Sequence, residues 1–472
     1  MVTTAEGTEF DVVVIGGGPG GYATALYGAS AGLSVAVVEK DKVGGTCLHR
    51  GCVPAKELLE TASVVRTVAG AKEFGVQAGE PAVDFAVSQG RKQKVVDQLH
   101  RGLSGLMKSR GIATLAGTGT LMGGGRVQVN GPDGTDEIAG RHVVLASGSV
   151  ARTIPGFEVD GKVVLTSDGV LALDELPASV AVIGGGAIGC EFASMFCDLG
   201  SRVTVLELLP TLLPGCDEDV VRVVARSFRK RGIAVHTGVS VHGHAPNGWG
   251  TTVSFGDDES ASVDAVVVSV GRRPSTEGLL ADGTGVEVTE RGFVAVDEYM
   301  RTGAERVWAV GDVVDTPQLA HVAFAEGIVA TKDILGEPVV PVDYARVPWC
   351  IYCHPEVAFA GLTESAARQA GIDVLVKQDP FGGNSRARII GETDGLVKVV
   401  AERASDGRAG RILGVHMVGP WVTEQLGQGY LAVNWEATPE EVGQFLQPHP
   451  SLSEAFGETV LALTGRGLHI SS

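Results

Sequence analysis

Two of the chain's cysteines stand close together in the stretch GTCLHRGCVPAK, at Cys47 and Cys52, although the 472 residues contain only 7 cysteines. Such a pair could bind zinc, form a structural disulfide, pack as two small apolar side chains or act as a redox dithiol. A zinc site would need cysteines separated by two to four residues and a second such pair. Cys47 and Cys52 have four residues between them. The other close pair, Cys350 and Cys353, lies far along the chain. A structural disulfide over so short a loop is disfavoured in a reducing compartment.

The residues around the pair favour a redox dithiol. Gly44, Gly45 and Gly51 permit a strained turn, and Pro54 suits the first turn of a helix that continues as AKELLETASVV. Cys52 would then lie near a helix N-terminus, where the helix dipole favours the thiolate.

A second chemically capable stretch, QPHPSLSEAFGETVLAL, carries His449 and Glu454. A dithiol substrate must lose a proton before it attacks a disulfide, and histidine has a suitable pKa for that task. A carboxylate such as Glu454 would orient the ring. The pattern Ser451-x-x-Glu454 also predicts a capping box opening the last helix, so an exposed turn histidine remains an alternative.

Two segments repeat one plan of strand, glycine turn, helix and strand ending in glutamate. They are residues 11–39 and 180–207, and the glutamate follows the first glycine at the same distance in both. The three glycines permit a tight turn, close approach of a pyrophosphate and close helix packing, while the glutamate suits ribose hydroxyls. The predicted nucleotide-binding residues are Gly16, Gly18, Gly21 and Glu39 in the first copy and Gly184, Gly186, Gly189 and Glu207 in the second.

The second copy favours NAD over NADP. The Glu207 carboxylate would repel a 2′-phosphate, and the following Leu208, Leu209 and Pro210 supply no arginine to hold one.

Three further apolar segments end in glycine. Two of them, VVLASGS and VVVSVGRRP, close on Gly148 and Gly271 and read as the last strands of the two nucleotide units. The third, VWAVGDVV, places Gly311 and Asp312 after a strand, where Asp312 is a candidate ligand or a simple turn residue.

These elements predict an α/β fold with two Rossmann-like nucleotide-binding domains and a C-terminal α+β domain. A long helical pattern near residues 54–110 interrupts the first domain. The expected divisions are 1–154 for the first nucleotide-binding domain, 155–274 for the second, 275–346 for a return segment and 347–472 for the α+β domain.

Composition excludes several other classes. The net charge of −18 argues against nucleic-acid binding, and 44% hydrophobic with 20% charged residues is typical of a globular protein. We find no apolar run long enough to span a membrane. The first residues lack the layout of a signal peptide, so we expect a cytoplasmic protein.

Taken together, GGTCLHRGCVPAK, the two glycine motifs, VWAVGDVV, NSRARIIGETDGLVKV and HPSLSEA resemble the pyridine nucleotide–disulfide oxidoreductases over essentially the whole chain. Among them the likeness is strongest to members that oxidise dihydrolipoamide. The resemblance implies a homodimer that holds no metal and uses FAD and NAD. The first nucleotide-binding domain would be the FAD domain, the second the NAD domain, and residues 347–472 the dimerisation domain. It also implies lipoyl domains of a 2-oxoacid dehydrogenase or glycine cleavage complex as partners.

The resemblance also implies residue roles. Cys47 would exchange with substrate sulfur, Cys52 would contact the flavin, and Lys56 would lie beside the flavin paired with Glu191. His449 and Glu454 would act as base and orienting carboxylate, contributed by the other subunit.

The chain departs from the family pattern in two places, with Gln447 where a histidine is common and Ser147 where threonine is usual. His49 and Arg50, between the cysteines, vary in the family and could tune the redox potential. The rival functions are reduction of another disulfide, such as glutathione, and a non-catalytic module that binds FAD and NAD. Cys47, Cys52 and His449 weigh against the latter, since a binding module needs none of them.

Overall fold

The computed structural model describes residues 9–470, which form two compact units. The first unit contains residues up to 58, then 84–152 and 271–344, and the second contains 59–83, 153–270 and the residues from 345 onward. The expectation that residues 1–8 carry no signal peptide lies outside the described residues. The four-part division of the chain stays a prediction.

The first unit is built on a sheet whose central strands are buried on both faces. The VVVI run of β1 (Glu9–Ile15) is buried throughout, as expected for a strand covered on two sides. It pairs in parallel with β2 (Val35–Glu39) and β6 (Gly134–Leu145), and β6 pairs in parallel with β17 (Val307–Ala309). The remaining strands are β3 (Ala113–Ala116) beside β2, β4 (Thr118–Gly123) and β5 (Arg126–Gly131) in an antiparallel meander with β6, and a ribbon of β7 (Ser149–Ala151) and β16 (Arg272–Pro274).

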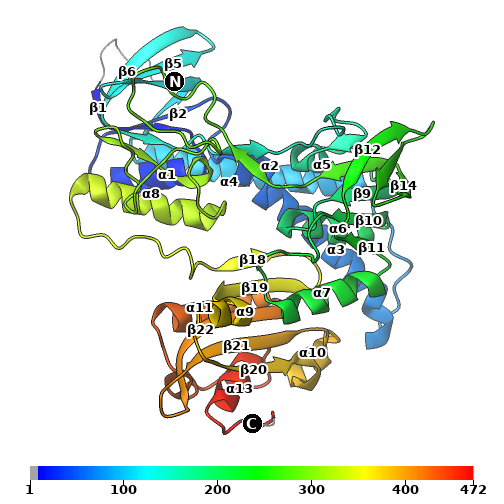
Figure 1. The fold of residues 1–472 in the computed structure, drawn as a ribbon. Helices are drawn as coiled ribbons and strands as arrows, with labels where there is room; N and C mark the ends of the chain where they lie inside the picture. Colours follow the sequence, from blue (N-terminus) through cyan, green and yellow to red (C-terminus); the bar gives the residue numbers. More distant parts are fainter. Residues whose placement is uncertain (1–8, 471–472) are drawn as a thin grey trace. The chain divides into compact units, whose positions relative to one another are not determined.

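Helices α1 (Pro19–Ser30) and α8 (Ala320–Leu335) pack side by side on this unit (Figure 1). The long helical pattern predicted near 54–110 is two helices, because GVQAGEP and the residues beside it break it. These two helices are α3 (Cys52–Gly70), which starts in the first unit and ends in the second, and α4 (Phe85–Ser109). A short helix, α2 (Gly45–Arg50), precedes them.

The second unit contains a five-stranded parallel sheet in the order β11-β10-β9-β15-β8. Like the apolar run of β1, its central strands are covered on both faces, and every residue of β9 and β15 is buried. A three-stranded antiparallel sheet of β12, β13 and β14 is inserted in the sequence between β11 and β15. The elements are β8 (Val164–Leu165), α5 (Ser167–Leu171), β9 (Ser179–Ile183), α6 (Ala187–Asp198), β10 (Arg202–Glu207), α7 (Glu218–Lys230), β11 (Ala234–Thr237), β12 (Val241–Pro246), β13 (Thr251–Phe255), β14 (Glu259–Val263) and β15 (Ala265–Val268).

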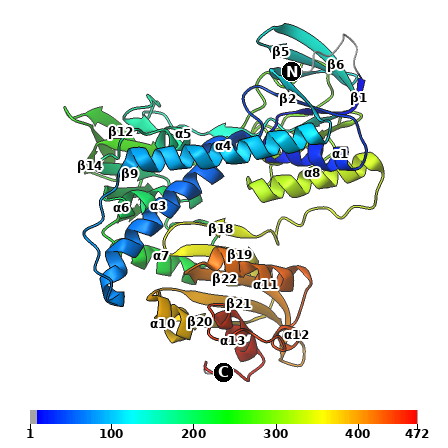
Figure 2. The ribbon, with the colours of Figure 1, turned by 180° about the vertical axis from the view of Figure 1, so that it is seen from behind.

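Beyond residue 347 the chain forms a five-stranded antiparallel sheet in the order β18-β19-β22-β21-β20, which fits the predicted α+β class. Figure 2 shows its strands together with α11, which packs on β19 and β22, and α13, which packs on β20 and β21. The elements are β18 (Trp349–Ile351), β19 (Glu356–Gly361), α9 (Glu364–Gln369), β20 (Val374–Pro380), α10 (Ser385–Ile390), β21 (Leu396–Arg403), β22 (Ala409–Gly419), α11 (Val422–Asn434), α12 (Pro439–Val442) and α13 (Glu454–Leu463).

Candidate active site

The segment with the two cysteines begins at a glycine turn that rests on the first nucleotide loop. Gly44 has φ 104° and Gly45 φ 57°, which lie in the left-handed region that favours glycine. The Gly44 N–H donates to the Gly17 carbonyl at 2.8 Å. A Cβ added at Gly45 would lie 2.6 Å from the Gly18 Cα. Only glycine therefore lets the two loops approach this closely.

Cys47 and Cys52 meet across the junction of two helices. Cys47 lies in α2, and Cys52 is the first residue of α3, as the sequence predicted. A hydrogen bond between the two thiols raises the pKa of Cys47, and burial adds to this, whereas the Lys56 ammonium lowers it. In the chain by itself Cys47 is half-buried and Cys52 is exposed. The two sulfurs are thus adjacent, and Lys56, one turn into α3, is the cation that acts on Cys47.

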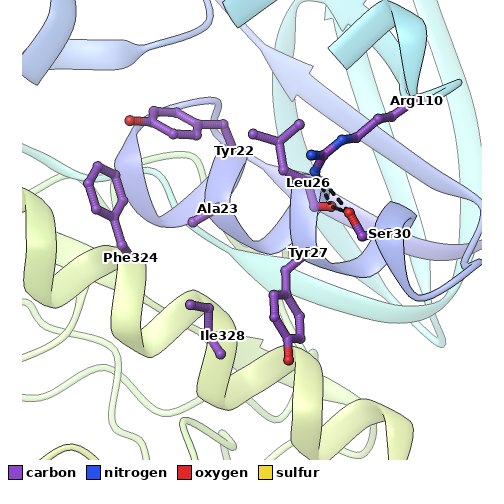
Figure 3. Close-up of a pocket in the computed structure, with 8 residues that line it drawn as sticks. All are labelled: Tyr22, Ala23, Leu26, Tyr27, Ser30, Arg110, Phe324 and Ile328. Carbon is purple, nitrogen blue, oxygen red and sulfur yellow. Dashed lines mark hydrogen bonds between the residues drawn. The ribbon is translucent and has the colours of Figure 1, made fainter. Parts of the chain in front are cut away.

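Tyr22, which the sequence analysis missed, also lies near the thiols. Burial and the charges of the two cysteines raise its pKa to about 12. Tyr22 also lines an apolar groove of about 340 Å³ between α1 and α8, in which its ring lies 5.5 Å from that of Phe324 (Figure 3). Arg110 lies at the end of this groove and donates to the Leu26 carbonyl at 3.0 Å.

The first nucleotide loop has the close packing that its glycines predict. Gly16 has φ 108°, and a Cβ there would lie 2.2 Å from the Ala146 carbonyl oxygen. Gly21 contacts the Gly16 carbonyl so tightly that a Cβ would lie 1.8 Å from its oxygen. Helix α1 begins directly after Gly18, so its free N–H groups face the loop. The Glu39 carboxylate ends β2 and accepts the Gly17 N–H at 2.7 Å.

Asp312 lies in a short 3₁₀ turn that follows β17, directly after Gly311. The Ser149 hydroxyl donates to its carboxylate at 2.5 Å, and the Arg272 guanidinium lies 3.7 Å away. Gly148 precedes Ser149 in the turn between β6 and β7, three residues beyond the end of β6. This brings the ends of β6 and β17 together at one edge of the parallel sheet.

A buried glutamate supports the turn at Asp312. Glu326, on α8, accepts the Gly311 N–H at 2.7 Å and the Tyr344 hydroxyl at 2.9 Å. Burial raises the pKa of Glu326 to about 7. The sequence gave no local signal for this residue, because it lies in the middle of an apolar helix.

The residues of the first unit fit a dinucleotide at this sheet edge. The Ser147 hydroxyl oxygen is buried and has no hydrogen-bond partner among the described residues. It lies between β6 and Gly148, near the glycine loop that packs against Ala146. A buried polar atom without a partner is costly, so a ligand with polar groups would satisfy it. Glu39 and Asp312 supply carboxylates suited to ribose hydroxyls.

The second nucleotide loop repeats this geometry. Gly184 has φ 103°, and Gly189 approaches the Gly184 carbonyl so closely that a Cβ would lie 1.9 Å from its oxygen. A Cβ at Gly186 would meet nothing within 4 Å, which leaves space for a phosphate before α6. Glu207 accepts the Gly185 N–H at 2.5 Å and the Leu209 N–H at 2.7 Å.

Gly271 and Glu191 occupy different settings from these loops. Gly271 lies beyond the end of β15, has φ 101° and accepts the Arg152 N–H at 3.0 Å, as part of the β7–β16 ribbon. Glu191 is buried on α6 and accepts the Tyr352 N–H at 2.9 Å. Lys56 belongs to the first unit and Glu191 to the second, so their pairing stays a prediction.

His449 and Glu454 form a hydrogen-bonded pair at the start of the last helix. His449 Nδ1 lies 2.8 Å from a Glu454 oxygen, and the histidine side chain is 70% exposed. A carboxylate only accepts hydrogen bonds, so Nδ1 carries the proton and Nε2 of the neutral ring is left as the basic atom. Hydrogen bonds from the Ser451 N–H and from His449 lower the pKa of Glu454 against the effect of burial.

The capping box predicted at Ser451 is wrong. Glu454 does accept the Ser451 N–H at 2.7 Å, but the Ser451 hydroxyl pairs with the Ser453 hydroxyl. The helix starts later, with Ser453 as its N-cap and no side-chain cap. Both Ser451 and Ser453 are suitable N-cap residues by type, and the backbone enters the helix after Ser453. Glu454 is left with its other oxygen on His449.

The structure contains no group of three or more His, Cys, Asp or Glu side chains within residues 9–470 that could hold a metal ion. The helices in that range include none long and apolar enough to cross a membrane.

Comparison with known proteins identifies the family. Residues 10–327 match the model of pyridine nucleotide-disulphide oxidoreductases, and residues 347–460 match the dimerisation domain of the same family. The chain belongs to this family. It is therefore a flavoprotein oxidoreductase with FAD and NAD as cofactors, and the match to the dimerisation domain supports a homodimer.

Similar proteins cover nearly the whole chain. A dihydrolipoyl dehydrogenase of Bacillus subtilis is 42% identical over 98% of this chain and 99% of its own length. A dihydrolipoyl dehydrogenase of Haloferax volcanii is 38% identical over 98% of each chain. Among solved structures, LpdA from Mycobacterium tuberculosis superposes with a TM-score of 0.90 at 27% identity, covering 97% of this chain and 99% of that one. The flavoprotein disulfide reductase RclA from Escherichia coli gives a TM-score of 0.85 at 28% identity, covering 95% and 99%.

Proposed function

We propose that the protein oxidises protein-bound dihydrolipoamide to lipoamide, with NAD⁺ as the final acceptor. The observation that carries this proposal is the contact between the Cys47 and Cys52 thiols at the start of α3. The identity of 42% to a dihydrolipoyl dehydrogenase over the whole length supports the choice of substrate. FAD, when bound, supplies the two-electron chemistry that links a dithiol to a pyridine nucleotide.

In the proposed reaction His449 acts first. Its Nε2 takes the proton from one substrate thiol, while Glu454 on Nδ1 holds the ring and stabilises the imidazolium. The two residues act on the cysteine pair of the other subunit of a homodimer. The exposure of His449 in the single chain agrees with a residue that completes a site on a partner.

The disulfide exchange then follows at Cys47. The substrate thiolate attacks the Cys47 sulfur, the Cys47–Cys52 bond breaks, and Cys52 leaves as a thiolate. The second substrate thiol loses its proton and attacks the substrate sulfur bound to Cys47, which releases lipoamide and the Cys47 thiolate. The two electrons of the substrate now belong to the Cys47–Cys52 pair. The Lys56 ammonium stabilises negative charge on Cys47.

The proposed nucleotide contacts follow the two loops. FAD would be held by the first loop and the adjoining turns, with Lys56 beside the flavin. The residues are Gly16, Gly18, Gly21, Glu39, Gly148, Gly311 and Asp312. Gly184, Gly186, Gly189, Glu207 and Gly271 would hold NAD. The partners would be a second copy of the chain and the lipoyl domain of a 2-oxoacid dehydrogenase or glycine cleavage complex, in the cytoplasm.

The unequal roles of the two cysteines can be tested by trapping. A Cys52→Ser variant, incubated with oxidised lipoamide and a maleimide that blocks the released substrate thiol, should carry a lipoamide adduct on the Cys47 peptide. The matched Cys47→Ser variant should carry little adduct on Cys52. Equal adducts in the two variants would show that both thiols exchange with the substrate and would contradict their unequal roles.

A further inference from the structure

Two histidine rings meet at the carbonyl oxygen of Val43, next to the redox pair. His49, on α2 between the two cysteines, places its Nε2 2.9 Å from this oxygen. His100, on α4, places its Nδ1 3.2 Å from the same oxygen. The ring centroids are 5.0 Å apart at an interplanar angle of 68°. Because a carbonyl only accepts, both of these ring nitrogens carry hydrogen.

The Val43 carbonyl belongs to the turn that positions the redox helix. Val43 is buried, and its side chain lies beside Gly17, where a Cβ would come within 3.2 Å of it. The next residue, Gly44, donates to the Gly17 carbonyl. The two imidazoles therefore hold the point from which α2 starts, directly against the first nucleotide loop.

Charged groups around His49 come from two directions. Asp41 and Lys42 lie in the turn before α2, and His100 projects from α4. On α2 itself Arg50 pairs with Asp41 at 2.9 Å. Burial, the His100 ring and Lys42 lower the pKa of His49, against the Val43 carbonyl and Asp41. The ring is therefore neutral at pH 7, and it becomes charged only in acid.

We propose that His49, held by the Val43 carbonyl and by His100, is a positioning residue that sets the redox equilibrium of the Cys47–Cys52 pair. While the ring is neutral, Arg50, paired with Asp41, is the one cation between the two cysteines. Protonation of His49 adds a second positive charge two residues from Cys47. This inference rests on the proposed function, because it requires Cys47 and Cys52 to form a reversible disulfide.

The effect follows from the balance of the reduction. A dithiol reductant gives two electrons and two protons and becomes a disulfide. The Cys47–Cys52 bond breaks and accepts both electrons. The pair keeps one proton when one sulfur remains a thiolate, and the other proton passes to the solvent. An imidazolium at His49 stabilises that thiolate and hence the reduced pair. Because one proton is released, the equilibrium constant for reduction falls in acid when a neutral residue stands at this position. With His49, whose protonation favours the reduced pair, the constant should fall less steeply.

The experiment uses the FAD-loaded dimer equilibrated with dithiothreitol and its cyclic disulfide from about pH 5 to about pH 8. Acid quenching, alkylation and mass spectrometry of the 45–56 region give the reduced fraction of the pair. The variant His49→Gln keeps a donor where Nε2 lies but cannot become charged. Relative to this variant, the wild type should gain up to about tenfold in the equilibrium constant on acidification, which is about 30 mV for a two-electron couple.

A second variant tests the role of His100 and also serves if His49→Gln fails to fold. His100→Asn keeps a donor where Nδ1 lies and removes a ring that lowers the pKa of His49. The gain relative to His49→Gln should therefore begin at higher pH in this variant. Superimposable curves for all three proteins would overturn the inference while leaving the disulfide intact. Absence of any reversible Cys47–Cys52 disulfide would overturn the proposed function together with the inference.

Discussion

Replacing Lys398 by methionine should destabilise the second unit strongly. Lys398, on β21, is 3% exposed, and its ammonium contacts three carboxylates: those of Asp217 at 3.0 Å, Asp219 at 2.6 Å and Glu364 at 2.9 Å. The first two lie at the start of α7, so this cluster ties that helix to the C-terminal sheet. Removing the cation leaves carboxylates facing one another with little water.

The magnitude follows from the burial of the partners. Asp217 is also 3% exposed and cannot turn away, because it caps α7 by accepting the Asp219 N–H at 3.0 Å. Removing one partner of a buried ion pair costs about 3–5 kcal/mol. Asp219 and Glu364 reach solvent with 18% and 31% of their side chains, so they add little to this figure. The expected loss is therefore about 3–5 kcal/mol in total.

The loss should also depend on pH. The hydrogen bond from Lys398 lowers the pKa of Glu364 below its ordinary 4.5. A carboxyl whose pKa is lowered by folding stabilises the fold above its unfolded pKa, and this contribution disappears as the pH falls through the folded value. The difference between wild type and Lys398→Met should thus narrow below about pH 4.5.

Hydrogen exchange of the β21 and β22 amides, with denaturant titration beside it, measures this loss locally. A matched control is Arg411→Met on β22 of the same sheet, whose partners Glu402 and Glu436 are 41% and 49% exposed. That change should cost at most about 1 kcal/mol. If Lys398→Met costs no more than Arg411→Met, the cluster does not stabilise the fold as argued.

Three further predictions concern the site. In the two-electron-reduced holoenzyme a long-wavelength thiolate-to-flavin absorbance should be visible and should vanish in Cys52→Ser; its survival would show that the inner thiol is misassigned. His449→Ala should slow dihydrolipoamide oxidation by about 10²–10⁴-fold yet largely spare NADH oxidation by an artificial dye, and equal loss of both activities would exclude the role of base. Gly45→Ala should weaken FAD retention, because the added Cβ would lie 2.6 Å from the Gly18 Cα. The control Gly32→Ala should retain FAD, because Gly32 is also at positive φ but an added Cβ there would meet nothing within 4 Å. Equal FAD retention in the two variants would refute the close approach of Gly45 to Gly18.

Features that depend on local spacing could be predicted from the sequence. The conformations of the two glycine loops, and the positions of Glu39 and Glu207, could be predicted because turn, helix and strand follow one another within one short unit. The start of α3 at Cys52 and the approach of Glu454 to His449 are local in the same way.

Features that join distant segments could not be predicted. Glu326 contacts Gly311 from the next helix, and Lys398 meets Asp217 across 181 positions of sequence. No periodicity marks either residue. The contact of two histidine rings with the Val43 carbonyl oxygen likewise requires His100, which lies 57 positions after Val43. The capping box failed for another reason: Ser451 and Ser453 are equally plausible caps by residue type, and only the backbone conformation distinguishes them.

The most direct test of the central claim is a steady-state comparison of substrates with the FAD-loaded dimer. Dihydrolipoamide would be compared with NAD⁺ and with NADP⁺, and glutathione disulfide and mercuric ion with NADH and NADPH. We expect dihydrolipoamide with NAD⁺ to give the highest kcat/KM, because Glu207 disfavours a 2′-phosphate and His449 serves a dithiol. Faster turnover of glutathione disulfide or mercuric ion, or a preference for the phosphorylated nucleotide, would contradict the account.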